Sequence, residues 1–281
     1  MNNKKSKKEL LELYKLYISL TCTGSTIKRY TNLVQWFLDT INDPYSATYA
    51  DVLKYVCSFK SLSTKAQAQG ALMHFYKGVI HKPELIVKLP KIKKSKGLPE
   101  ILSETEIEIV LSNIKNLKHK AIISTIYYNA LRISEVINLH VTHINGTNRT
   151  LHIKFSKGAK SRVIPFSKDL HNLLINYYKK YRPKSYLFAG QSNPRYTAPS
   201  IRKILKNALL KSGITRNVTP HGLRHSRATH LLSNGMDIKL LKEFLGHYKI
   251  TTTEKYIHLQ TNDLMEAINL ADKRIALKAV A

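Results

Sequence analysis

The sequence predicts a mainly α-helical protein with a small antiparallel β-sheet, divided into two domains. Apolar residues recur at three- and four-residue spacing along most of the chain, as in amphipathic helices. One stretch, residues 151–155, instead alternates apolar and polar residues, as a half-buried strand does. A segment rich in proline, glycine and lysine, residues 81–99, separates two regions that are each long enough to bury a core.

The region before this segment, residues 1–80, predicts a helical module. Its four helices are expected over residues 5–20, 25–41, 48–59 and 63–80. The second of them, "STIKRYTNLVQWFLDTI", has Ser25 as its predicted N-cap. Its apolar residues then share one face: Ile27, Tyr30, Val34, Phe37, Leu38 and Ile41. Such a face is expected to pack against the neighbouring helices.

A basic linker is predicted over residues 81–99. The stretch from His81 to Glu100 contains three prolines, one glycine, and six lysines against two glutamates. Proline and glycine disfavour a continuing helix, so an extended connection between domains is expected. The alternative is a disordered, solvated charge run. Both interpretations can hold, because an extended basic linker can lie along a phosphate backbone.

The second domain is predicted over residues 100–281 and is mostly helical. Ser103 and Glu106 form a capping box ahead of an apolar run, and residues 120–139 are a strongly apolar helical stretch. A β-hairpin follows, in which the alternating Leu151, Ile153 and Phe155 lead through the turn "SKGAK" to a second strand. Further helices are expected over residues 198–213, 219–232, 238–247, 251–259 and 261–280.

The charge of the chain predicts a polyanionic partner. Lysine and arginine number 46 against 18 acidic residues, a formal net charge of +28. This excess destabilises the compact state by self-repulsion, and nucleic acid is the partner that most often accounts for it. The alternatives are a generic basic surface and, on charge alone, a membrane surface.

A cytoplasmic location is expected. The chain has only two cysteines, Cys22 and Cys57, and no CxxC pair, which argues against a disulfide scaffold or a cysteine-based zinc site. Charged residues interrupt the apolar residues of the first twenty positions, so no signal peptide is predicted. No apolar run approaches the roughly 18 residues of a membrane span.

Two basic residues of the second domain are candidates for binding an anion. Arg132 lies within the largely apolar "YYNALRISEV", and a guanidinium near a core needs an anionic partner. Glu135, three residues on, is the alternative partner in a purely structural pair. Lys157 lies at the tip of the predicted hairpin, where a lysine is more often simply solvated.

The remaining candidates lie in the last third of the chain. His221 and Arg224 are three residues apart, so a helix places them on one face. His221 and His225 also have the spacing of metal ligands, although HExxH is absent and no cysteine or carboxylate lies within their segment. His247 and Tyr256 follow, nine residues apart; Tyr256 is one of 16 tyrosines, most of which are expected to pack with a polar tip in water.

The order of these residues resembles the signature of the tyrosine recombinases, a family of site-specific DNA recombinases. The specific part lies in "ALRISEVINL", "KGAKSRVIPF" and "TPHGLRHSRATHLLSNGMDIKLLKEFLGHYKITTTEKYIHL". The arginine, lysine, His-x-x-Arg, histidine and tyrosine of the signature fall on Arg132, Lys157, His221, Arg224, His247 and Tyr256. Two positions depart from the usual pattern: Ala130 replaces a glycine, and Arg227 replaces an apolar aromatic residue.

The resemblance implies a two-domain clamp around DNA. Residues 1–80 would be the SAM-like core-binding domain, 81–99 the linker, and 100–281 the catalytic domain. The implied reaction cleaves and rejoins DNA through a 3′-phosphotyrosine on Tyr256, with no metal and no nucleotide cofactor. Arg132, Arg224 and His247 would bind the phosphate, His221 would accept the tyrosine proton, and Lys157 would protonate the leaving oxygen.

Several alternatives stay open at this point. A type IB topoisomerase would use the same chemistry, and a catalytically silent DNA-binding protein would use none. The chain resembles the compact Xer-type or transposon-encoded recombinases more than the larger phage integrases with an arm-binding domain. Its role could therefore be chromosome-dimer resolution, cointegrate resolution, or integration and excision of an element.

Assembly is expected to involve the C-terminal helix. Leu264, Ile268, Ala271 and Ile275 form one apolar stripe. The stripe packs either on its own domain or, as in related recombinases, on the neighbouring subunit of a homotetramer on DNA.

Overall fold

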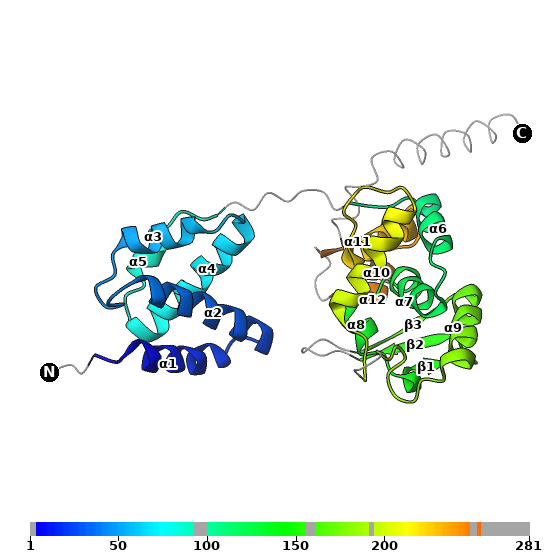
Figure 1. Ribbon diagram of the computed structural model, residues 1–281, viewed down its shortest axis with the longest axis horizontal. Coiled ribbons are helices and arrows are strands. Elements are labelled where there is room, and N and C mark those ends of the chain that lie inside the picture. The colour runs from blue at the N-terminus through cyan, green and yellow to red at the C-terminus, as the bar shows by residue number, and fades with distance from the viewer. Residues whose placement is uncertain (1–3, 93–99, 155–160, 191–193, 248–251, 254–281) are drawn as a thin grey trace, which may run out of the picture. The chain divides into compact units, whose positions relative to one another are not determined.

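The structure is a computed structural model that describes residues 4–92, 100–154, 161–190, 194–247 and 252–253. It comprises two compact units, Met1–Gly97 and Leu98–Ala281 (Figure 1). The described residues are mostly helical, and they contain one sheet of three antiparallel strands. The predicted fold class is therefore confirmed. No helix in the described part of the chain is long and apolar enough to cross a membrane.

The first unit is built from helices. They are α1 (Lys7–Ser19), α2 (Gly24–Thr40), α3 (Tyr49–Ser58), α4 (Leu62–Phe75), the π-helical turn η1 (Tyr76–Ile80) and α5 (Glu84–Val87). The predicted face of α2 is inward, with Val34, Phe37 and Leu38 fully buried against α1 and α4. The helix starts slightly earlier than predicted, because Thr23 has the extended backbone of an N-cap and Ser25 already lies in the first turn.

The first unit continues beyond Ile80. The short helix α5 contacts α3 and α4, and Ile86 and Leu89 are buried in the same core as α2. Residues 84–89, which the sequence assigns to the linker, therefore belong to this unit. Burial of their apolar side chains outweighs the helix-breaking effect of the flanking prolines. Residues 93–99 lie outside the described residues.

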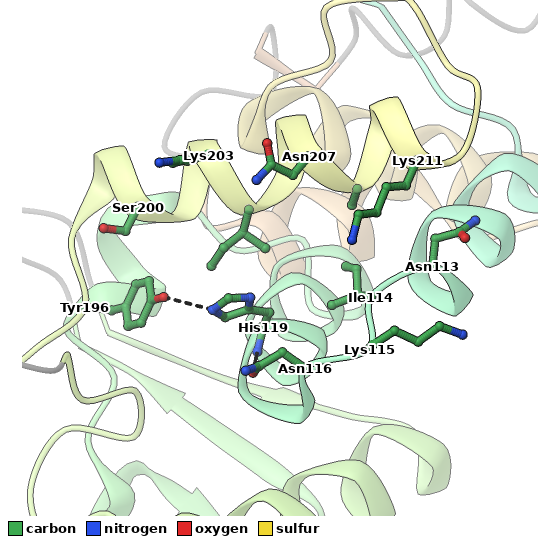
Figure 2. Close-up of a pocket in the computed structure, with 12 residues that line it drawn as sticks. Asn113, Ile114, Lys115, Asn116, His119, Tyr196, Ser200, Lys203, Asn207 and Lys211 are labelled. Atoms are coloured by element: carbon green, nitrogen blue, oxygen red, sulfur yellow. Dashed lines mark hydrogen bonds between the residues drawn. The ribbon is translucent and has the colours of Figure 1, made fainter.

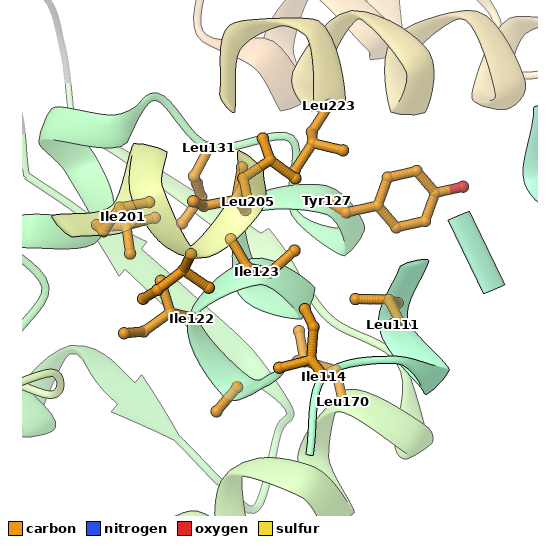
Figure 3. Packing of buried hydrophobic residues seen from close by; sticks show 14 of the residues in the cluster. Leu111, Ile114, Ile122, Ile123, Tyr127, Leu131, Leu170, Ile201, Leu205 and Leu223 are labelled. Carbon is orange, nitrogen blue, oxygen red and sulfur yellow. The ribbon is translucent and has the colours of Figure 1, made fainter. Parts of the chain in front are cut away.

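The second unit surrounds one central helix. Its helices are α6 (Glu104–Ser112), α7 (Leu117–Tyr128), α8 (Ile133–Ile137), η2 (Val141–His143), α9 (Lys168–Tyr181), α10 (Ala198–Lys211), α11 (Pro220–Ser233) and α12 (Ile238–Leu245). Helix α7 contacts α6, α8, α9, α10 and α11. Figure 3 shows Ile122, Ile123 and Tyr127 of α7 among Leu170, Leu205 and Leu223 of three surrounding helices.

The sheet confirms the predicted hairpin. Its strands β1 (Ile144–Asn145), β2 (Thr150–Ile153) and β3 (Arg162–Pro165) are antiparallel in that order. Leu151 pairs with Ile164, and both are buried, whereas Val163 is exposed. This alternation places Arg162 on the same inner face as Ile164. Phe155 and the hairpin tip lie outside the described residues.

The apolar stretch 120–139 is divided into two helices. Helix α7 ends at Tyr128, where the amides of Ala130 and Leu131 donate to the carbonyls of Tyr127 and Ile126, respectively, in a Schellman motif. The motif requires a left-handed residue, and Ala130 adopts it with φ of 46°. Glycine is the usual residue in this conformation, which gives a physical reason for the family's preference at the position. The turn directs the chain into Arg132 and α8.

Candidate functional site

Helix α11 is the segment "TPHGLRHSRATHLL", and it presents His221 and Arg224. Thr219 caps the helix by accepting a hydrogen bond from the amide of Gly222 (3.1 Å). A Cβ added at Gly222 would lie 3.2 Å from the carbonyl oxygen of Glu100, so glycine permits this close approach. Ser226 then accepts a hydrogen bond from the amide of Leu102 (2.9 Å). The start of the domain is thereby tied to the helix that carries two predicted site residues.

Helix α12 ends beside these residues and presents three consecutive carbonyl oxygens. It stops because Gly246 has a left-handed backbone with φ of 64°. The carbonyls accept hydrogen bonds from three arginines: Phe244 from Arg162 Nε (2.9 Å), Leu245 from Arg224 Nη2 (2.7 Å), and Gly246 from Arg132 Nη2 (3.4 Å). A helix C-terminus carries partial negative charge, so it is a favourable place for cations.

Glu135 binds the same three arginines from the opposite element, α8. Its carboxylate accepts from the backbone amide and Nη1 of Arg132 (both 2.9 Å) and from Nη1 and Nη2 of Arg162 (both 3.0 Å). Arg224 Nη1 lies 3.8 Å from it. Burial alone would raise the pKa of Glu135, but the hydrogen bonds and charge of Arg162, with Arg132 and Arg224, hold that pKa below its usual value.

The Arg132–Glu135 pair, considered from the sequence as the structural alternative, is therefore present. Arg162 and Glu135 are the two members of this cluster that the sequence analysis did not count among the site residues. The strand pattern could have identified Arg162, because residues two apart in a strand share a face and Arg162 is two residues before the buried Ile164. Such an arginine needs an acidic partner, but the sequence alone does not say which one.

Arg224 is fully buried and connects the cluster to His247. Its Nη1 donates to the carbonyl of Ala130 (2.6 Å), and its Nη2 lies 3.0 Å from His247 Nε2. The other ring nitrogen of His247, Nδ1, lies 3.0 Å from Thr253 Oγ1. Burial, followed by the charges of Arg224 and Arg132, lowers the pKa of His247 to about 3. His247 is therefore neutral at physiological pH in this arrangement.

His221 lies one helical turn before Arg224 on α11 and is exposed. Its ring packs edge-to-face on that of His225, with 4.3 Å between the centroids. Partial desolvation, and then the charges of Arg224 and Arg132, lower the pKa of His221. A neutral exposed imidazole can accept a proton. Within the described ranges, no third ligand joins His221 and His225 in a group that could hold a metal ion.

Four of the six predicted site residues thus lie in one cluster: Arg132, His221, Arg224 and His247. The other two, Lys157 and Tyr256, lie outside the described residues. Arg227, which replaces an apolar aromatic residue, packs its guanidinium over the rings of Tyr127 (5.4 Å) and Tyr128 (5.8 Å). The half-buried Arg227 side chain therefore covers the two tyrosine rings, as an apolar aromatic side chain at this position would.

A separate hollow lies between α10 and the turn that joins α6 to α7 (Figure 2). Its volume is about 470 Å³, and the described residues that line it include Lys115, Lys203 and Lys211 but no acidic residue. Tyr196 Oη lies 3.2 Å from His119 Nε2 at one end of it. None of the four predicted site residues that the structure describes lines this hollow.

Comparison with known proteins places this architecture. Residues 100–263 match the Phage integrase family. The tyrosine recombinase XerA of Pyrococcus horikoshii is 35% identical over 275 residues, which cover 94% of this chain and 93% of XerA. A crystal structure of the recombinase XerH bound to a palindromic difH substrate, a post-cleavage complex, has a TM-score of 0.74 and 21% identity, and covers 96% of this chain and 86% of XerH.

A more distant structure has the same fold. The lambda integrase tetramer bound to a Holliday junction has a TM-score of 0.77 and 13% identity, and covers 91% of this chain and 78% of that one. The names of these relatives favour the recombinase over the topoisomerase and the silent DNA-binding protein. The family match over more than half of the chain, the full-length similarity to XerA and the shared fold lead to one conclusion. The chain belongs to the tyrosine recombinases of the phage integrase family and is a site-specific DNA recombinase.

Proposed function

We propose that Arg132, Lys157, His221, Arg224, His247 and Tyr256 carry out DNA strand cleavage and rejoining through a 3′-phosphotyrosine. The observation that carries this proposal is the meeting of Arg132, Arg224 and His247 at the end of α12. Two guanidiniums there bond adjacent carbonyls, and the next residue is the histidine. Nucleophilic attack on a phosphodiester builds negative charge on its non-bridging oxygens, and this group supplies donors for that charge.

Arg132 is the first contact for the phosphate. Its side chain is 36% exposed, whereas those of Arg162 and Arg224 are 9% and 0% exposed, so it alone of the three is open to DNA without rearrangement. A guanidinium presents a fork of permanently charged donors suited to phosphate oxygens. Removal of one preorganised donor in comparable oxyanion sites costs about 3–4 kcal/mol of transition-state stabilisation.

Arg224 joins the phosphate when an oxygen replaces His247 Nε2 as the acceptor for its Nη2. His247 then no longer accepts a hydrogen bond at that nitrogen, and the nearby negative charge raises the pKa of its ring. The released Nε2 can carry a proton and donate to the phosphate. Binding of the phosphate therefore reorganises the pairing of Arg224 with His247.

The two proton transfers are assigned to His221 and Lys157. A phenol in water has a pKa of about 10, so a tyrosine nucleophile needs a base as it attacks phosphorus. His221 is neutral and solvent-accessible, which suits that role. Lys157 gives a proton to the 5′ oxygen that leaves, and a 5′-hydroxyl later attacks the phosphotyrosine to rejoin the strand.

The two units divide the work on DNA. The first unit, which includes residues 84–89, binds the core of the recombination site, the basic residues that follow Leu89 lie along the phosphate backbone, and residues 100–281 hold the reaction centre. Four copies assemble on DNA, with each C-terminal helix received by the next copy. The lambda integrase tetramer on a Holliday junction supports this stoichiometry, and the apolar stripe of residues 264–275 supports the contact.

The test starts from DNA that the protein protects around its own gene. A nick is placed near the protected centre, so that cleavage releases a short fragment with a 5′-hydroxyl. This fragment diffuses away, and the covalent adduct accumulates. The full chain should give an adduct on a denaturing gel, and a peptide containing Tyr256 should carry the nucleotide. Tyr256→Phe should bind the same DNA with unchanged affinity and form no adduct. An adduct that persists in this variant, or that maps to another tyrosine, would refute the assignment.

A further inference from the structure

We infer that Arg162 is a positioning residue of the cleavage site, which holds Glu135 and the end of α12 in the geometry that Arg132 and His247 need. The inference rests on the proposed function, because it concerns the same site. Arg162 itself is not proposed to touch DNA. Its side chain is only 9% exposed, so its charge is directed into the protein.

The donor pattern of Arg162 joins three elements. From β3 it donates Nη1 and Nη2 to the two oxygens of Glu135 on α8 (both 3.0 Å) and Nε to the carbonyl of Phe244 on α12 (2.9 Å). A bidentate fork fixes the plane of the carboxylate as well as its position. The third bond fixes where α12 ends relative to that plane.

Glu135 transmits this constraint to Arg132. Each carboxylate oxygen is shared between the two arginines: Oε1 accepts from Nη1 of both, and Oε2 accepts from Arg162 Nη2 and from the backbone amide of Arg132. The carboxylate thus holds both the backbone and the guanidinium of Arg132. Without Arg162, the partners that Glu135 keeps among the described residues are Arg132 and, at 3.8 Å, Arg224, so the plane of the carboxylate is no longer fixed from the β3 side.

Phe244 transmits the constraint to the other phosphate ligands. The next carbonyl, that of Leu245, accepts from Arg224, and His247 follows two residues later. A shift of α12 would therefore move the acceptor of Arg224 and the ring of His247 together. Catalysis depends on such positions to within about an ångström. At metal sites, loss of a group that orients a ligand costs about 10–100-fold in affinity or activity, and we expect an effect of that order here.

Lysine cannot replace Arg162 in this role. Its ammonium is one point charge, so it can approach one carboxylate oxygen but cannot hold both oxygens and the Phe244 carbonyl. Arg162→Lys keeps the net charge of +28 and therefore the general attraction to DNA. A residue whose contribution is charge alone would be rescued by lysine, and a positioning residue would not.

The experiment measures three quantities for each variant of the full chain: the single-turnover rate of adduct formation on nicked site DNA at saturating protein, the half-site Kd by gel shift, and the Tm. Arg162→Lys should slow the rate about 10–100-fold and change Kd by less than about threefold. Arg216→Lys is the matched control. Arg216 also joins a backbone carbonyl, that of Ile101, to a glutamate, Glu106, in the same unit.

Acidic pH supplies a second readout, one that a purely structural role would not move. In the described part of the chain, the charges that face Glu135 come from Arg132, Arg162 and Arg224. Arg162 is the largest cause that lowers the pKa of Glu135, so Arg162→Met raises that pKa. The cleavage rate of this variant should then fall as the pH is lowered through the raised pKa, because a protonated Glu135 no longer holds Arg132. The double variant Arg162→Met/Glu135→Gln should be slow and should show only the fall that protonation of His221 causes in every variant. It also removes both members of the buried pair, so it tests the role if a single variant does not fold.

The outcomes separate the inference from the proposed function. Suppose that the unchanged chain forms its adduct at Tyr256. The inference alone is then overturned if Arg162→Lys forms adduct at a rate within about twofold of the unchanged chain, or no more slowly than Arg216→Lys. A loss of rate matched by an equal loss of half-site affinity also overturns it and makes Arg162 a binding residue. A normal chain that forms no adduct at Tyr256 overturns both proposals.

Discussion

Nη2 of Arg224 lies 3.0 Å from Nε2 of His247, and this contact fixes the protonation of the imidazole. A guanidinium only donates hydrogen bonds, so Nε2 is an acceptor and the proton of the neutral ring lies on Nδ1. That proton points to Thr253 Oγ1, also at 3.0 Å. His247 thus lies between one donor and one acceptor as the tautomer protonated on Nδ1. Donation to a phosphate from Nε2 would require a proton on that nitrogen instead.

The pH dependence of stability should reveal this neutral histidine. The pKa of His247 is about 3 in the folded chain and 6.5 as its ordinary value, so the unfolded chain binds more protons in between. The contribution of the neutral His247 to stability is therefore fully present above pH ~6.5 and is lost as the pH falls toward 3. Melting curves from pH 7 to pH 4 should show a smaller fall in Tm for His247→Gln than for the unchanged chain. Other histidines with lowered pKa are common to both proteins, so an identical fall in both would contradict the prediction.

Thr253 should matter for cleavage through its hydroxyl. It is fully buried, and Thr253→Val keeps its shape but leaves the Nδ1 proton of His247 without its acceptor. A buried donor without an acceptor costs about 1–3 kcal/mol, so we expect the ring to leave this orientation in the valine variant. We expect Thr253→Val to slow adduct formation about tenfold at unchanged half-site affinity. Thr253→Ser, which keeps the hydroxyl, should stay within about threefold, and equal rates for the two variants would exclude the hydrogen bond as the cause.

Ala130 shows how strain and burial offset each other at one position. Its left-handed backbone costs about 1–2 kcal/mol relative to glycine. Its methyl group, however, is buried against Ala228, Leu241 and Leu245, and glycine would also gain entropy in the unfolded state. We therefore expect Ala130→Gly to change the free energy of unfolding by less than about 1 kcal/mol. Ala130→Val, a β-branched residue at positive φ, should lower it by more than about 2 kcal/mol. Chemical denaturation of both variants measures the difference.

Much of the fold could be predicted because its signals are local. The Ser103–Glu106 capping box, the face of α2 and the alternation of β2 each depend on residues a few positions apart, and the structure has all three. The break at Ala130 was not predicted, because an alanine within an apolar run carries no local stop signal. The three-arginine arrangement was not predicted either. Its acceptors are backbone carbonyls of α12, and no side-chain pattern marks a carbonyl that a distant guanidinium will find.

Lys157 should be required only when the leaving oxygen needs a proton. Lys157→Ala is expected to slow adduct formation at least ~100-fold on ordinary DNA, in the range of general acid catalysis. On DNA with sulfur in place of the scissile 5′ oxygen it should react at close to the normal rate, since a thiolate leaves without a proton. Lys154→Ala, on the same hairpin, is the matched control. Equal slowing of Lys157→Ala on both substrates would make Lys157 a positioning or binding residue.

The C-terminal stripe should join copies of the chain on DNA. Leu264, Ile268, Ala271 and Ile275 repeat at four-, three- and four-residue spacing, so a helix would place them on one apolar face. If this face binds the neighbouring copy, a chain that ends after Thr261 should fold and bind a half-site normally. It should lose cooperative occupation of the full site and strand exchange, because each contact in a cyclic assembly supports the next. Gel shifts on half and full sites, beside a melting curve, measure these effects.

A point variant refines that prediction and separates the two possible partners of the stripe. Ile268→Lys places a charge on the apolar face, whereas Asn269→Lys places the same charge one residue away, outside the predicted stripe. The first should reproduce the loss of cooperativity and the second should not, since burying an unpaired ammonium is costly. A drop in Tm and in half-site affinity for Ile268→Lys would instead mean that the face packs on its own domain. Normal strand exchange by both the truncated chain and Ile268→Lys would remove the segment from assembly altogether.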